Sequence, residues 1–132
     1  MAIRIVRLGT PRTLDEGLRL GTVRRPPRGV RKQDWGSRDY FDVWMPELAP
    51  SEDLRAWAMA EPLTPRRWTS YKRRYLAQMR RPQAQRLITL LAALSWQTNF
   101  AVGCYCEDEL HCHRLLLRTL LAAQGATIVS SG

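Results

Sequence analysis

The sequence predicts an α/β protein with a mostly parallel sheet and flanking helices, in a Rossmann-like three-layer arrangement. Apolar segments of strand length alternate along the chain with longer segments of helical periodicity. The last third of the chain has the order strand, helix, strand, which predicts a C-terminal βαβ unit with parallel strands and a right-handed crossover. The length of 132 residues, 45% of them hydrophobic, predicts one compact domain over 1–132.

The first half of the chain contains short strands separated by a long basic loop. Residues 2–8 alternate apolar and cationic side chains, which is typical of a strand with one buried face. The segment 10–35 is rich in turn residues, and we expect a loop there with a short strand at 18–23. Residues 41–45 predict a further short strand, which Pro46 ends.

Two helix starts follow, each with a capping residue. Ser51 precedes the acidic residues Glu52 and Asp53, so a helix is expected directly after it. Thr64 is the expected cap of a second helix, because the proline that follows it loses no hydrogen bond at the first helical position. This second helix is expected to continue to about Arg81, where the next proline interrupts it.

The C-terminal half alternates helices and strands. Leucines at helical spacing predict a third helix over 83–94. The apolar segment 100–106 predicts a buried strand, and a short acidic turn over 107–110 separates it from a helix over 112–124. The residues 126–130 predict the last strand.

Arginine dominates the charge of the chain. Lys and Arg together number 21 against 12 Asp and Glu, which gives a formal net charge of +9. A guanidinium suits phosphate and carboxylate groups, so this excess favours anionic partners. On the second helix, the pairs Arg66/Arg67, Arg73/Arg74 and Arg80/Arg81 recur every seven residues and form a cationic stripe, whose members Arg66, Arg73 and Arg80 are here called the arginine ridge. The alternative is a solvated face that is neutralised by acidic residues, for which the candidates are Glu47, Glu52, Asp53 and Glu61.

Residues 104–114, CYCEDELHCHR, hold all the cysteines and histidines of the chain. The predicted elements place this segment between the carboxyl end of a strand and a helix N-terminus, where open α/β sheets bind their ligands. Three cysteines leave one unpaired in any disulfide scheme, which is typical of a reducing compartment. Because neither a signal peptide nor a long apolar run is present, we expect a cytoplasmic protein without a membrane partner.

This segment allows four interpretations. A metal site would use Cys104, Cys106 and Cys112 with one histidine, but the spacing differs from known zinc loops, and no metal is predicted. A thiol enzyme would use Cys106, Cys112 and His113, because a helix N-terminus and nearby cations stabilise a thiolate; the spacings of phosphatase loops and of the C-x-x-C motif are absent. An anion site would use the free N–H groups of the helix. Packing alone is the fourth interpretation.

Four blocks of the sequence resemble the DUF488 family, including its YeaO-like branch. They are RRPPRGVRK at 24–32, DVWMPELAPSEDLRAW at 42–57, RRWTSYKRRYLAQM at 66–79 and CYCEDELHCHRLLL at 104–117. The chain departs from the YeaO-like pattern at Val23, Pro26 and Ala60, where an acid, a tryptophan and a histidine are usual. The resemblance implies a Rossmann-like α/β domain and implies no particular reaction.

The favoured functional hypothesis is a protein that binds a phosphate-bearing anion, as a nucleotide, another phosphorylated small molecule or nucleic acid. The residues expected to bind the anion are cationic: Arg24, Arg28, Lys32, Arg66, Arg73, Arg80 and Arg114. One alternative is a thiol-dependent enzyme that uses the Cys-His-Arg segment, and another is an interaction protein whose arginine ridge binds an acidic partner. No cofactor and no oligomeric state is predicted.

Overall fold

The computed structural model describes residues 1–108 and 111–129, and in them the chain forms an α/β fold around a parallel sheet. The strands are β1 (Ile3–Arg7), β2 (Leu18–Gly21), β3 (Val43–Trp44) and β4 (Phe100–Cys104), in the spatial order β1-β4-β2-β3. All three pairings are parallel. The predicted fold class is confirmed, and each of these strands lies within a segment that the sequence predicts as extended.

The helices are α1 (Glu52–Ala60), α2 (Pro65–Gln78), α3 (Pro82–Leu94) and α4 (His113–Ala123), with 3-10 turns η1 (Lys32–Asp34) and η2 (Pro46–Leu48). The predicted caps are confirmed: Ser51 Oγ accepts the Leu54 N–H at 3.2 Å, and Thr64 Oγ1 accepts the Arg67 N–H at 3.2 Å. The helix α2 ends at Gln78, earlier than expected, and α3 begins at the proline that interrupts it.

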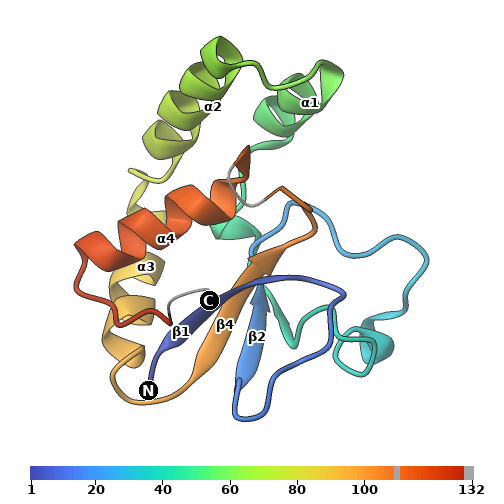
Figure 1. Ribbon diagram of the computed structural model, residues 1–132, viewed down its shortest axis with the longest axis vertical. Coiled ribbons are helices and arrows are strands. Elements are labelled where there is room, and N and C mark those ends of the chain that lie inside the picture. The colour runs from blue at the N-terminus through green and yellow to red at the C-terminus, as the bar shows by residue number, and fades with distance from the viewer. Residues whose placement is uncertain (109–110, 130–132) are drawn as a thin grey trace.

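All four helices contribute to one core on the same face of the sheet. Ile3, Leu20, Phe100 and Val102 project from the strands into this core. The helices supply fully buried residues such as Tyr75 and a set of aliphatic side chains: Leu54, Ile88, Leu117 and Leu121. In Figure 1 the helices lie to the left of and above the sheet, whereas the segment 22–42 lies to its right.

Loops, rather than helices, form the third layer. On the second face of the sheet a Cβ on Gly21 would overlap the Phe41 ring, and a Cβ on Gly103 would lie 2.6 Å from the Val6 carbonyl oxygen. Phe41 packs with Leu8 and other apolar residues in a separate cluster. Gly21 is therefore required by the close approach of Phe41 from the covering segment, and Gly103 by the close approach of Val6 in the neighbouring strand and of Leu8.

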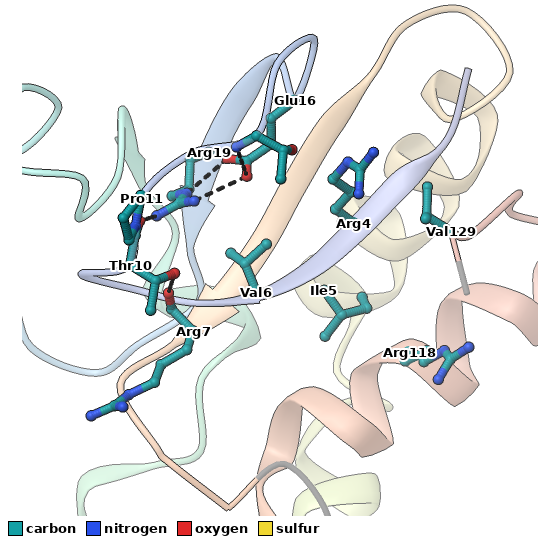
Figure 2. Close-up of a pocket in the computed structure, with 11 residues that line it drawn as sticks. Arg4, Ile5, Val6, Arg7, Thr10, Pro11, Glu16, Arg19, Arg118 and Val129 are labelled. Atoms are coloured by element: carbon teal, nitrogen blue, oxygen red, sulfur yellow. Dashed lines mark hydrogen bonds and ion pairs between the residues drawn. The ribbon is translucent and has the colours of Figure 1, made fainter. Parts of the chain in front are cut away.

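A buried ion pair stabilises the long loop that leads into β2. The Arg19 side chain, 0% exposed, donates through Nε to Glu16 at 2.8 Å and through Nη1 to the carbonyl oxygens of Thr10 and Asp39. Figure 2 shows this pair beside the amino-terminal loop. Because every charged nitrogen in the pair has a partner, its burial is tolerated.

The segment after α4 returns to the sheet beside β1. Ile3 N–H donates to the Thr127 carbonyl at 2.9 Å, and Val129 N–H donates to the Ile3 carbonyl at 2.9 Å, which forms a single parallel bridge at Ile128. The expected strand over 126–130 is thus reduced to this bridge among the described residues, and its last residue lies outside them, as do residues 109–110 of the expected acidic turn. The crossover from β4 passes over β1 rather than joining adjacent strands.

A search of the described helices finds none that is long and apolar enough to span a membrane.

Candidate functional site

A cavity of about 680 Å³ lies beyond the carboxyl ends of β2 and β4. These strands are neighbours and parallel, so the segments that follow them leave the sheet at one edge. The loop after β2 contributes Arg24, Arg25 and Arg28 to the cavity, and the segment after β4 contributes the cysteines and both histidines. Two motifs that are about 80 residues apart in the sequence therefore share one site.

The three cysteines meet at the inner wall of this cavity. Their Sγ atoms all lie within 4.8 Å of one another. Cys104 and Cys112 are buried, and their Sγ atoms are 2.7 Å apart, whereas Cys106 is exposed. Cys106 is therefore the thiol that a ligand in the cavity can reach, with two buried thiols behind it.

The electrostatic environment separates the three thiols. Hydrogen bonds from Cys104 and then from Cys112 lower the pKa of Cys106 against the opposing effect of burial, and the nearby Arg114 cation lowers it further. The same interactions, together with burial, raise the pKa of Cys112 well above its usual range and that of Cys104 to about 12. The cluster thus carries its negative charge on the exposed sulfur.

His113 is a buried, neutral imidazole at the first turn of α4. Its Nε2 donates to the Thr22 carbonyl oxygen at 2.6 Å, since a carbonyl can only accept. Burial lowers the pKa of His113 below its ordinary value. Its Nδ1 lone pair therefore faces the Cys112 sulfur, 3.7 Å away, and can accept the thiol proton. Because His113 is neutral near pH 7, Arg114 is the permanent cation beside Cys106.

Arg114 is buried without a described counterion. The residue is 4% exposed, and its Nε atom makes no hydrogen bond with any described residue. Within residues 1–108 and 111–129, no carboxylate lies at ion-pair distance from it. A buried guanidinium that lacks a carboxylate requires another source of negative charge. Among the described residues the Cys106 thiolate is one such source, and an anion bound beside Cys106 would be another.

The loop arginines have different environments. Arg24 donates to the carbonyl oxygens of Pro46, Ala49 and Pro50, so its guanidinium holds the loop against the segment before α1. Arg25 forms an ion pair with Glu52 at 2.9 Å.

The next two cations of that loop differ in their position relative to the cavity. Arg28 is exposed, lines the cavity, and has no hydrogen bond or ion pair with another described side chain. Lys32, in η1, is not part of the wall. Arg28 is thus the loop cation that is available for a ligand.

An aspartate and a histidine that the sequence analysis did not select also belong to this site. Asp108 Oδ2 lies 2.7 Å from His111 Nδ1, and His111 lines the cavity with its ring edge-on to Trp68. Tyr71 of α2 also lines the cavity. Burial raises the pKa of its hydroxyl, and the negative charge of the three nearby thiols adds to this effect. The signal that was missed is the i, i+3 spacing of Asp108 and His111 within the turn.

The arginine ridge lies away from the cavity. Tyr71, which lines the cavity, is buried, and Arg66, Arg73 and Arg80 are exposed on the opposite side of α2. None of the three has an ion pair with a described residue.

The neighbouring arginines of the same repeat have a structural environment. Arg67 and Arg74 cover the Trp57 ring at 4.1 and 5.1 Å from its centroid, and Arg67 also pairs with Glu61. Of the acidic residues that were considered as partners of the stripe, Glu61 therefore pairs with Arg67, whereas among the described residues none of the four pairs with Arg66, Arg73 or Arg80.

The cysteine cluster is also the donor set that a thiophilic metal would use. The sequence spacing argued against such a site, yet the fold brings the three sulfurs together. Two thiolates on one tetrahedral zinc ion, each at about 2.3 Å, lie about 3.8 Å apart. The 2.7 Å contact between Cys104 and Cys112 is shorter, so these two sulfurs would have to separate before they could share an ion.

A second cavity, of about 310 Å³, lies along β1. Figure 2 shows the paired Arg19 and Glu16 on one side of β1, which carries Arg4, and Arg118 of α4 on the other side. No cysteine or histidine lines it. Among the described residues, the cysteines and histidines all lie at the larger cavity.

Comparison with known families supports the resemblance noted in the sequence. The model of DUF488-N3a, described as "Active DUF488-N3 subclade", matches residues 3–125. The chain belongs to this DUF488 family. The match names the N3 subclade and does not specify the YeaO-like branch. No curated protein and no solved structure matches the chain.

Proposed function

We propose that this DUF488 protein is a thiol-dependent enzyme that binds a phosphate-bearing anion, such as a nucleotide, and attacks it with Cys106. The observation that carries the proposal is the meeting of an exposed thiol and a loop arginine without a described partner at one cavity, with a buried arginine close to the thiol that has no carboxylate partner among the described residues. The description of the matching subclade as active agrees with a catalytic site.

The anion would be held between the loop and the start of α4. Arg28 supplies a mobile, solvated cation, whereas Arg114 supplies a fixed one with an Nε donor that is free among the described residues. No side chain caps the N-terminus of α4, so its first N–H groups add donors for negative charge. Together these groups favour a phosphate over a neutral ligand.

The residues around Cys106 divide the chemical work. Cys106 attacks an electrophilic centre of the bound ligand as a thiolate. Cys112 donates its single S–H to this thiolate, and the His113 ring lies beside the Cys112 sulfur with its Nδ1 atom 3.7 Å away. His111, oriented by Asp108, is the proton donor for the leaving group. The arrangement supplies nucleophile, acid and anion site without a cofactor of its own.

Protection of Cys106 from alkylation tests this proposal. Wild-type protein is treated with iodoacetamide at pH 7 with increasing inorganic phosphate or adenosine monophosphate, and modification at Cys106 is followed by mass spectrometry. We expect protection by the phosphate compounds and about tenfold weaker protection in Arg28→Ala, because one charge-assisted hydrogen bond contributes about 1.5–3 kcal/mol. Arg73→Ala, on the ridge, is the matched control and should behave as wild type.

Two results would contradict the proposal. Labelling of Cys106 no faster than that of the unfolded chain would exclude an activated thiol. Equal labelling with and without every phosphate compound would exclude an anion beside it.

A second function, nucleic-acid binding, is favoured by the arginine ridge. Arg66, Arg73 and Arg80 are exposed, point away from the cavity and have no acidic partner among the described side chains. Each phosphate contact adds about 0.9 to the slope of log K against log salt, so the triple alanine variant should reduce the slope by about 2–3. An unchanged slope would exclude this use of the ridge, and binding to an acidic protein but not to DNA or RNA would identify it as a protein interface.

A further inference from the structure

The proposed function uses Cys106 and one donor behind it, but it leaves the contact between the two buried thiols without a role. Cys104 and Cys112 are 1% and 2% exposed, so no ligand in the cavity reaches either sulfur directly. Their Sγ atoms are nevertheless 2.7 Å apart and within 4.8 Å of Cys106. Packing alone would be satisfied by alanine or serine at these positions.

We propose that the three cysteines form a thiol relay: a hydroperoxide oxidises Cys106, and the oxidation passes through Cys112 to end as a buried disulfide between Cys104 and Cys112. The relay makes Cys106 an oxidation site that regenerates itself. It shares the exposed Cys106 thiolate with the proposed function but needs no bound phosphate.

The first step takes place at the cavity. The Cys106 thiolate attacks one oxygen of the hydroperoxide, so an S–O bond forms and the O–O bond breaks. With hydrogen peroxide the leaving group is hydroxide, and the sulfur is oxidised by two electrons to a sulfenic acid. Arg114 faces the negative charge that moves from sulfur to oxygen in this step.

The second step uses the buried thiol nearest to a base. Cys112 passes its proton towards His113 Nδ1, 3.7 Å from the sulfur, and attacks the Cys106 sulfur. The S–S bond forms as the S–O bond breaks, and the departing hydroxide takes this proton and leaves as water.

The third step moves the disulfide into the core. Cys104 loses its proton and attacks the Cys112 sulfur, with which it is already in contact, and Cys106 leaves as a thiolate. A thiol of low pKa is the better leaving group, so the exchange favours release of Cys106. The released proton neutralises the hydroxide of the first step. In sum, one hydrogen peroxide and two thiols give one disulfide and two waters.

Mass spectrometry of trapped species tests the relay. The reduced full-length protein is treated with hydrogen peroxide, alkylated and digested. In wild type we expect a Cys104–Cys112 disulfide with Cys106 still free to alkylate. Cys104→Ser should stop at a Cys106–Cys112 disulfide, and Cys112→Ser should accumulate the sulfinic acid of Cys106. Cys106→Ser should form the buried disulfide at least about tenfold more slowly, because both remaining thiols are protonated.

The wild-type result alone decides the matter even where a variant folds poorly. Cys112→Ser is the mildest change, since serine is a better N-cap than cysteine for α4. Wild type that ends with an oxidised Cys106 and two free buried thiols would overturn the relay, and so would a Cys106→Ser variant that forms the buried disulfide as fast as wild type. Phosphate protection of Cys106 is measured on reduced protein, so its failure leaves this result unaffected.

Discussion

Removing the Cys112 thiol measures how far its neighbours stabilise the negative charge on Cys106. A hydrogen bond to a charged acceptor contributes about 1.5–3 kcal/mol, and S–H is a weak donor, so we take about 1.5 kcal/mol. Since one pKa unit corresponds to 1.36 kcal/mol, Cys112→Ala should raise the pKa of Cys106 by about one unit. Cys112→Ser keeps a donor and is expected to raise it less.

The assay is the pH dependence of alkylation at Cys106, read site by site by mass spectrometry. An ordinary thiol with a pKa of about 8.5 gains about 800-fold in rate between pH 5 and pH 8, because its thiolate fraction rises over that range. The lowered pKa of Cys106 predicts a nearly flat profile over the same range in wild type. A wild-type rate that rises about tenfold per pH unit over this range would contradict a stabilised thiolate, and so would Cys112→Ala and Cys112→Ser profiles that coincide when they are extended to the acid range in which Cys106 titrates.

Three further predictions concern stability. Burial lowers the pKa of His113 in the folded state, so the unfolded state binds the proton more readily below pH 6.5. As the pH falls below 6.5, the free energy of unfolding should therefore decrease by up to about 1.4 kcal/mol per pH unit. Thermal melts of His113→Gln should show a smaller dependence of stability on pH over the same range. Glu16→Gln leaves the buried Arg19 charge unpaired and should reduce the free energy of unfolding in urea by about 3–5 kcal/mol, whereas a loss below about 1 kcal/mol would show that the pair is dispensable. Gly21→Ala places a methyl group against the Phe41 ring and should cost about 1–3 kcal/mol in the same assay, with no loss if the ring moves freely.

The elements that could be predicted from the sequence are those with local causes. The side chains of Ser51 and Thr64 cap their helices by accepting the backbone N–H groups three residues further on, and alternation of apolar residues is sufficient to define β1. The position of the site also follows from local order, since the cysteine segment joins a strand end to a helix start in a parallel sheet.

The remaining features depend on contacts between distant segments. Nothing local distinguishes Arg24, which binds three carbonyl oxygens, from Arg28, which has no described partner. Cys112 lies at a helix N-terminus, which suggests an activated thiol, but the fold buries it behind Cys106. Its two sulfur neighbours therefore decide its pKa, and the helix position does not.

What covers the second face of the sheet also depends on contacts between distant segments. Helices on both faces are the usual expectation for a parallel sheet. Here the segment 22–42 covers the second face, where Gly21 lets Phe41 approach β2 closely and Gly103 leaves room for Val6 and Leu8. Glycines within strands indicate that another part of the protein approaches the strand backbone closely, but they do not identify which segment it is.

A crystal structure of the reduced protein with millimolar inorganic phosphate tests the central claim most directly. We predict a phosphate in the large cavity, in contact with Arg28 and Arg114 and beside the Cys106 sulfur. Phosphate bound only along Arg66, Arg73 and Arg80, with the cavity holding solvent and Arg114 bonded to a protein carboxylate, would contradict it.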